Sequence, residues 1–167
     1  AIEVLVNRDQ QVLPSIVQRV VECPEVHKAG ALLDILPRLS NNKDSIVFAN
    51  NVAQANSLDK LLPNAMLIHG QTPRAERSAI LEKYRQIGGV LITTPGILGR
   101  GFHHDRLYLV VLMGPVRVDD YLHVIGRCGR FGREGLSVML LASHELKVVN
   151  HLERHYQMPR DTICPLE

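Results

Sequence analysis

Short runs of β-branched and aliphatic residues alternate along the chain with segments whose apolar residues recur at helical spacing. Most of these runs are apolar at every position, which is typical of strands buried on both faces of a parallel sheet. Five such strands are predicted, at Ser45–Asn50, Ala65–His69, Val90–Thr94, Leu107–Leu112 and Leu136–Ala142. A sixth, at Ile16–Val21, is placed at an edge of the sheet.

Helices are predicted between the strands, at Val26–Leu39, Val52–Leu62, Arg74–Gln86, Asp119–Arg127 and His144–His155. Pro37 predicts a kink or an early end of the first helix, whose buried stripe is expected at Ala29, Leu32, Leu33, Leu36 and Leu39. Strands that alternate with helices pair in parallel through right-handed crossovers. The sequence therefore predicts an α/β fold of three layers, with a mostly parallel, doubly wound sheet between the helices.

The size of the chain, 167 residues, suits one domain. We assign residues 1–14 to an arm or interdomain linker, residues 15–158 to the domain and residues 159–167 to a tail. A content of 46% apolar and 22% charged residues excludes a disordered or fibrous protein, and no apolar run is long enough to cross a bilayer. Three cysteines without metal-ligand spacing, and a start without a signal-peptide pattern, favour an intracellular protein with no membrane partner.

The net charge is only +2, from 19 Lys and Arg against 17 Asp and Glu. Bulk attraction to a polyanion is therefore weak, and any site for one must be built locally. Four tyrosines, three phenylalanines and no tryptophan also disfavour a surface that binds single strands mainly by base stacking.

Polar donors follow three of the predicted strands, and ligands bind at the carboxyl ends of strands in doubly wound sheets. The loops to inspect begin at Asn50, His69, Thr94, Leu112 and Ser143. Asn50 and Asn51 stand at a helix start, where main-chain N–H groups attract phosphate. The loops also contain cationic residues and glycines that allow a ligand to approach the backbone: Gly70, Arg74, Arg77, Arg100 and Gly101.

Gly-Arg pairs recur at three-residue spacing between Gly126 and Gly135. Glycine permits close approach of the backbone to a ligand. Arg127 and Arg130 would lie on one face of a helix end, where two neighbouring guanidinium groups suit a phosphoryl group. The alternatives are a solvated basic turn, or arginines that close the carboxyl end of a helix.

Four segments together resemble motifs of the second, carboxyl-terminal RecA-like domain of the DEAD-box ATP-dependent RNA helicases. Ser45–Asn51 is similar to motif IV, His69–Arg77 to the adjacent RNA-contacting segment, and Val90–His103 to motif V. Tyr121–Arg130, with the sequence YLHVIGRCGR, is similar to motif VI and is the most specific of the four. The resemblance extends from roughly Ile16 to Ala142.

The resemblance implies a role for each matching residue. Arg127 and Arg130 would be arginine fingers for the γ-phosphate of an ATP held by a partner domain, and His123 would contact that domain's acidic motif; these are the expected catalytic residues. The expected RNA-binding residues are Asn50, Asn51, His69, Gly70, Arg74, Arg77, Thr94, Arg100 and Gly101. The expected nucleotide-binding residues are Gly101, His103, Arg127 and Arg130, and no metal ligand is expected.

The chain departs from the family's motifs at four places. Val124 replaces an arginine of motif VI, and His103 replaces the aspartate that binds the ATP ribose. Pro95-Gly96 stands where the family has Thr-Asp, which removes an N–H donor and a hydroxyl from the expected RNA contact. The segment Met113-Gly114-Pro115 lacks the acidic residue that usually precedes the proline.

The sequence contains no phosphate-binding loop of the form Gly-x-x-x-x-Gly-Lys-[Ser/Thr] and no Asp-Glu-Ala-Asp tetrapeptide. The chain is therefore expected to be one half of a longer or two-part assembly, and to be monomeric and catalytically silent by itself. ATP and Mg²⁺ are expected only together with the missing first RecA-like domain, and RNA and that domain are the expected partners. Two alternatives stay open: a RecA-like RNA- or protein-binding scaffold without ATP-driven remodelling, and a DNA helicase of a related superfamily.

Overall fold

Seven strands and three α-helices make up the part of the chain that the computed structural model describes, which is residues 16–98, 104, 106–115, 135–147 and 163–165. The strands are β1 (Ile16–Glu22), β2 (Asp44–Phe48), β3 (Met66–Leu67), β4 (Val90–Thr93), β5 (Leu107–Leu112), β6 (Gly135–Leu141) and β7 (Ile163–Pro165). The helices are α1 (Lys28–Leu39), α2 (Val52–Leu61) and α3 (Arg74–Ile87), and the single 3₁₀ turns are η2 (Glu25–His27) and η4 (Ser143–Glu145). None of the described helices is long and apolar enough to span a membrane.

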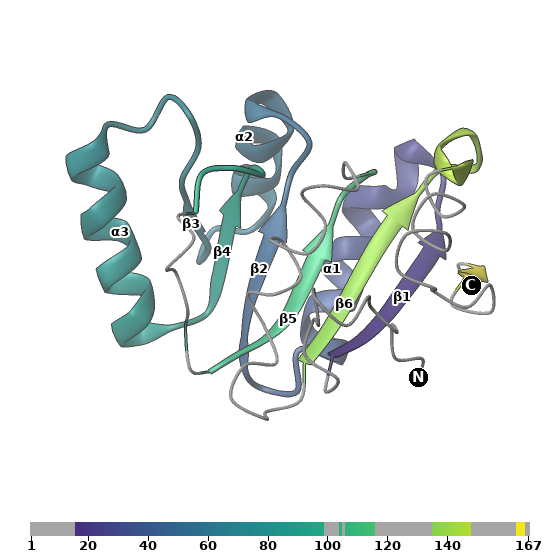
Figure 1. The fold of residues 1–167 in the computed structure, drawn as a ribbon, viewed down its shortest axis with the longest axis horizontal. Helices are drawn as coiled ribbons and strands as arrows, with labels where there is room; N and C mark the ends of the chain where they lie inside the picture. The colour runs from purple at the N-terminus through teal and green to yellow at the C-terminus, as the bar shows by residue number, and fades with distance from the viewer. Residues whose placement is uncertain (1–15, 99–103, 105, 116–134, 148–162, 166–167) are drawn as a thin grey trace, which may run out of the picture.

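All seven strands form one sheet in the order β3-β4-β2-β5-β6-β1-β7, and every described pair is parallel (Figure 1). The six strands predicted from the sequence are therefore confirmed, as is the parallel sheet. The edge position predicted for β1 is wrong, because Val20 and Val21 pair with Ile163 and Cys164 of β7. The short strand β7 lies in the segment that the sequence assigns to a tail.

The sheet is buried on both faces, as a parallel sheet between helices requires. Helices α1 and α2 lie on one face, where Leu32 and Leu58 pack with Val47, Val111 and Val138 in one core cluster (Figure 1). The residues that point to the opposite face are buried as well, and they include Ile46, Leu91, Val110 and Met139. The sheet is thus the middle layer of the three-layer fold.

Helix α1 buries a different stripe from the one expected. Its buried residues are Lys28, Ala31, Leu32, Ile35 and Leu36, whereas Leu33 is 42% exposed and Leu39 is 37% exposed. The stripe is rotated toward Ala31 and Ile35, and a lysine takes its first position. The early end predicted from Pro37 is wrong, because α1 continues to Leu39. Helices α2 and α3 are confirmed within one residue at each end.

Two predicted helices fall largely outside the described residues. The segment Asp119–Arg127 lies entirely outside them. Of His144–His155, the structure describes the first residues only, which contribute to the 3₁₀ turn η4. The arm at residues 1–14 is also outside the described part of the chain.

A cluster around Asp44 fixes the amino-terminal edge of the sheet. Asp44 begins β2; its Oδ1 accepts a hydrogen bond from the Gly89 N–H at 2.8 Å, and its Oδ2 lies 2.5 Å from His104 Nε2. Arg106 Nε donates to the same Oδ2 at 3.1 Å. Tyr84 of α3 donates its hydroxyl to the Ser45 carbonyl at 2.7 Å. The cluster thus joins the starts of β2, β4 and β5 to α3. It lies at the amino-terminal edge of the sheet, whereas the predicted site lies at the carboxyl-terminal edge.

Candidate functional site

The carboxyl ends of the strands meet along one edge, because all the pairs are parallel. The strand order places the ends of β3, β4, β2, β5 and β6 side by side, and neighbouring strands lie about 4.8 Å apart. Main-chain bonds continue this arrangement past the strands: the Ala49 N–H donates to the Thr93 carbonyl at 2.8 Å, and the Met113 N–H donates to the Phe48 carbonyl at 3.0 Å. The loops that follow β2, β4 and β5 therefore lie along one edge of the sheet.

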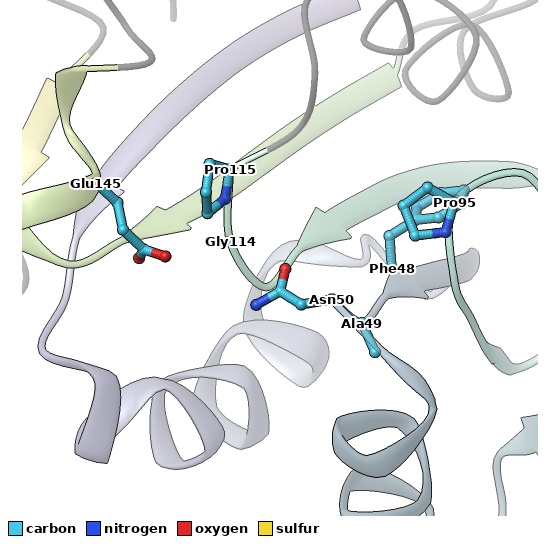
Figure 2. Close-up of a pocket in the computed structure, with 7 residues that line it drawn as sticks. All are labelled: Phe48, Ala49, Asn50, Pro95, Gly114, Pro115 and Glu145. Atoms are coloured by element: carbon cyan, nitrogen blue, oxygen red, sulfur yellow. The ribbon is translucent and has the colours of Figure 1, made fainter.

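A cavity of about 310 Å³ opens at this edge. It collects residues from the ends of β2, β4 and β5 and from η4, namely Phe48, Ala49, Asn50, Pro95, Gly114, Pro115 and Glu145. Figure 2 shows the Glu145 carboxylate and the Asn50 amide on opposite sides of the cavity, directed toward each other, with Pro115 between them and Pro95 beyond Asn50. The cavity therefore combines an apolar lining with one amide and one carboxylate.

The two asparagines after β2 have different roles. Asn51 is the N-cap of α2, and its side chain accepts the Gln54 N–H at 2.8 Å. The Gln54 side chain in turn accepts the Asn50 N–H at 2.7 Å. These bonds occupy main-chain donors that we expected to be available for phosphate. Asn50 is exposed and lines the cavity, so its side-chain amide is the group that a ligand can reach.

Gly114 packs directly against Asn50. A Cβ atom at Gly114 would lie 2.5 Å from Asn50 Oδ1 and 2.6 Å from Nδ2, which is closer than real contacts allow. Asn50 Nδ2 donates to the Met113 carbonyl at 3.4 Å. Glycine at this position therefore lets the Asn50 amide lie against the end of β5.

Replacing Gly114 with alanine should move the Asn50 side chain and leave the fold intact. The clash is with the end of a movable side chain, so we expect the free energy of unfolding to change by no more than about 1 kcal/mol. The affinity for RNA, the ligand that the sequence predicts for Asn50, should fall several-fold, because the amide leaves its place in the cavity. Thermal unfolding and fluorescence anisotropy with a labelled RNA measure the two effects. A large loss of stability with unchanged affinity would contradict this role of Gly114.

A buried ion pair lies behind the cavity. Lys28 Nζ lies 2.7 Å from Glu145 Oε1 and 2.7 Å from Glu25 Oε2, and it donates to the Met113 carbonyl at 3.0 Å. Glu145 Oε1 also accepts the Ala142 N–H at 2.9 Å. Burial by itself raises the pKa of Glu145, but the hydrogen bonds from Lys28 and Ala142 and the charges of Lys28 and His144 outweigh it, so the pKa lies below its ordinary value. The carboxylate is thus ionised at neutral pH.

The loop after β3 is organised by Arg77. Its Nε donates to the Thr72 carbonyl at 2.8 Å, and its Nη2 donates to the Gly70 carbonyl at 3.0 Å. His69 Nδ1 accepts the Gln71 N–H at 3.1 Å, which tightens the same loop. Arg74, at the first turn of α3, is exposed and has no hydrogen-bond partner among the described residues. Arg77 therefore shapes the loop, whereas Arg74, which bonds to none of the described residues, can meet a ligand.

Pro95 lines the cavity, whereas Thr94 does not. Thr94 follows β4, is only 9% exposed and is not among the lining residues. Its carbonyl accepts the Ile97 N–H at 3.4 Å, and Gly96 has a φ of 89°, a conformation that favours glycine. The chain therefore turns directly after Pro95 and presents the pyrrolidine ring to the cavity.

All four residues expected to bind nucleotide lie outside the described residues, namely Gly101, His103, Arg127 and Arg130. The expected catalytic residue His123 and the expected RNA-binding residue Arg100 also lie outside them, as does Val124. Of the expected RNA-binding residues, the structure brings Asn50 to the cavity and places Asn51 and Thr94 beside it. It places His69, Gly70, Arg74 and Arg77 around the end of β3, two strands from β2 in the sheet order.

Lys28 and Glu145 belong to the site, although we did not predict them from the sequence. Glu25, three residues before Lys28, is a local signal for an ion pair. No local signal links Lys28 to Glu145, which is 117 residues away in the sequence.

A parallel sheet with a ligand-sized cavity at its carboxyl edge is typical of doubly wound α/β domains. The helicase conserved C-terminal domain family matches residues 27–132, well over half of the chain. The chain therefore belongs to this family, and it is identified as the C-terminal RecA-like domain of a DEAD-box protein.

Two curated relatives illustrate the match. The probable eukaryotic initiation factor 4A of Trypanosoma cruzi is 26% identical over 165 residues, which cover 96% of this chain and 41% of the relative. The ATP-dependent RNA helicase sub2 of Aspergillus terreus is 29% identical over 164 residues, which cover 94% of this chain and 37% of the relative. The chain thus spans about two fifths of the length of these relatives.

Two solved structures share the fold. Dbp5 of S. cerevisiae, bound to RNA and ADP BeF3, has a TM-score of 0.79 and 25% identity, with 91% of this chain and 41% of that chain covered. Domain 2 of the DEAD-box helicase Mss116p, bound to an RNA duplex, has a TM-score of 0.78 and 26% identity, with 90% and 64% covered.

Proposed function

We propose that the chain is the second half of an ATP-dependent RNA helicase. It binds the RNA backbone along the carboxyl edge of its sheet and supplies arginine fingers to ATP in a cleft shared with a first RecA-like domain. The observation that carries this proposal is the convergence of the ends of β2, β4 and β5, together with η4, on one cavity that has the exposed amide of Asn50 at its side. Contacts of this kind position a strand without reading its sequence.

The relatives support RNA as the ligand. Dbp5 and domain 2 of Mss116p were solved with RNA, and the second of these structures is described as one domain bound to a duplex. Binding by a single domain is thus a reasonable expectation for this chain as a monomer. Arg74, exposed at the first turn of α3, supplies a cation where a phosphate would follow the edge of the sheet.

ATP and Mg²⁺ would be held mainly by the first RecA-like domain. This chain would add Arg127 and Arg130 to the γ-phosphate and His123 to the contact between the domains; all three belong to the segment similar to motif VI. Positioned cations stabilise the charge that develops during phosphoryl transfer. The full-length protein would then couple closure of the two domains on RNA to hydrolysis, and the isolated chain would be inactive.

A scaffold that binds RNA or protein without ATP-driven remodelling is the second candidate. The observation that favours it is Pro95, which lines the cavity where the family has a residue with a hydroxyl and an N–H. His103 in place of the ribose-binding aspartate points the same way. RNA-stimulated ATP hydrolysis by the full-length protein distinguishes the two candidates.

Replacing Arg74 and Arg77 separately with alanine should give different results. Arg74→Ala should weaken RNA binding and reduce the slope of log affinity against log salt concentration by about 0.9, the value for one phosphate contact on a duplex. Its melting temperature should stay unchanged, because Arg74 is exposed. Arg77→Ala should lower both the affinity and the melting temperature, because two carbonyl groups lose their donor.

Arg38→Ala is the matched control for the loss of one positive charge. Arg38 is exposed in the last turn of α1, at the end of that helix opposite Lys28, and pairs with Asp34. Anisotropy titrations over a range of salt concentrations measure all three variants. If the Arg74 variant binds RNA as tightly as the Arg38 variant, Arg74 does not contact the RNA.

A further inference from the structure

Lys28 is a charged side chain that is almost completely buried. The residue is 1% exposed, and lysine rarely occupies such a position without partners. An ammonium group has three N–H donors, and three acceptor oxygens surround Nζ within 3.0 Å, from Glu25, Glu145 and Met113. Its donors are therefore all used inside the protein, and it is not available to bind a phosphate.

The three acceptors come from three separate segments. Glu25 lies in η2, Met113 directly follows β5, and Glu145 lies in η4. The Met113 carbonyl also accepts the side-chain amide of Asn50. Lys28 is thus connected to both polar side chains of the cavity: to Glu145 directly, and to Asn50 through a shared carbonyl.

The charge of Glu145 is a difficulty for a site that takes a polyanion. Its carboxylate lines the cavity, and its side chain is only 14% exposed, so water screens it poorly. A nearby like charge costs binding energy when a phosphate enters. The ammonium of Lys28, 2.7 Å from the carboxylate, offsets this charge. Glu25 is on the solvent side of Lys28, with its side chain 56% exposed, and is screened by water.

We propose that Lys28 is a positioning residue of the RNA site: it neutralises Glu145 from behind the cavity and holds Asn50 through the Met113 carbonyl. The inference rests on the proposed function, since it matters for activity only if this edge binds RNA. Lys28 acts through its neighbours and does not touch the ligand.

The test is a double-mutant comparison of RNA affinity. The probe is a short, mixed-sequence, fluorescein-labelled RNA duplex, and the proteins are the wild-type chain, Lys28→Met, Glu145→Gln and the double variant Lys28→Met/Glu145→Gln. Methionine keeps the length of the side chain without its charge, and glutamine keeps the shape of Glu145 without its charge. Lys60→Met, at an exposed position in the last turn of α2, is the control for losing one positive charge. Circular dichroism establishes that each protein is folded at the assay temperature.

Lys28→Met should lower the affinity about tenfold, because it leaves Glu145 as an unpaired negative charge beside the RNA. The double variant should recover to within about threefold of the wild type, and Glu145→Gln alone should bind at least as well as the wild type. If Lys28→Met does not fold, the double variant is compared with Glu145→Gln: the two should bind RNA within about threefold of each other, and a larger loss in the double variant would overturn the inference. Equal weakness of the double and single variants, or unchanged binding by Lys28→Met, would overturn the inference. A wild-type chain that binds no RNA would instead refute the proposed function, and this inference with it.

Discussion

Replacing Arg127 and Arg130 together with alanine in the full-length protein is expected to abolish RNA-stimulated ATP hydrolysis. Each guanidinium offers charged, forked donors to the transferring phosphoryl group. In other NTPases an arginine finger contributes about 10³–10⁵-fold to the rate. A steady-state ATPase assay at saturating RNA should therefore show a loss of about a thousandfold or more in kcat. The KM for ATP should change less, because the first domain holds most of the nucleotide.

Arg133→Ala is the matched control for this double variant. Arg133 belongs to the same Gly-Arg run but has no counterpart in the segment similar to motif VI. Its replacement removes a positive charge from the same stretch of sequence and should leave kcat within a few-fold of the wild type. Turnover by the Arg127/Arg130 variant at the level of the Arg133 variant would show that the two arginines are not fingers.

Removing the carboxylate of Asp44 is expected to cause the largest loss of stability. Its side chain is 13% exposed and bonded to Gly89, His104 and Arg106, so Asp44→Ala leaves the three donors without their common acceptor. Breaking a buried charged network of this kind costs about 3–5 kcal/mol. The free energy of unfolding of a natural domain is about 5–15 kcal/mol in total, so the variant should unfold at a much lower urea concentration than the wild type.

Asp34→Ala is the control for Asp44→Ala. Asp34 also pairs with an arginine, at 2.8 Å from Arg38, but both side chains are more than 60% exposed. An exposed pair of this spacing contributes about 0.3–0.5 kcal/mol at most. If both aspartate variants unfold at the same urea concentration, the cluster at the amino-terminal edge of the sheet does not hold the strands together.

The stability of the chain should also depend on acid through Asp44. Burial raises the pKa of Asp44, but the hydrogen bonds from Gly89, His104 and Arg106 outweigh it and place the pKa below its ordinary value of 3.8. A carboxyl group with a lowered pKa in the folded state stabilises the protein above pH 3.8 and loses this effect as the pH falls through its folded pKa. Urea titrations between neutral and acidic pH should show this loss in the wild type, and a shallower one in Asp44→Asn.

The parallel sheet could be predicted because its strands are short, apolar runs with helical segments between them. A run that is apolar at nearly every position predicts a buried strand without reference to the rest of the chain, as Leu107–Leu112 does. Strand β7 could not be found in this way, because three residues are too few to produce a pattern, and its place is set by pairing with β1. The stripe of α1 was misplaced because leucines at both 32 and 33 fit two rotations of the helix.

The candidate site also has features that could be predicted from the sequence and features that could not. Its location followed from topology, since parallel strands bring Asn50 and the residues after β4 and β5 to one edge. The ion pair between Lys28 and Glu145 could not be predicted, because it joins residues 117 positions apart and places a lysine in a buried stripe. The division of labour between Arg74 and Arg77 was also hidden, because both are arginines at a helix start. Only the bonds to Gly70 and Thr72 distinguish them.

RNA-dependent ATP hydrolysis by the full-length protein tests the central claim most directly. The assay compares that protein with the 167-residue chain, each with and without RNA. The full-length protein should hydrolyse ATP faster when RNA is present, whereas the chain alone should bind RNA and hydrolyse nothing. A full-length protein that binds RNA but shows no hydrolysis, or hydrolyses ATP at the same rate without RNA, would contradict the claim that this domain completes an RNA-activated ATPase.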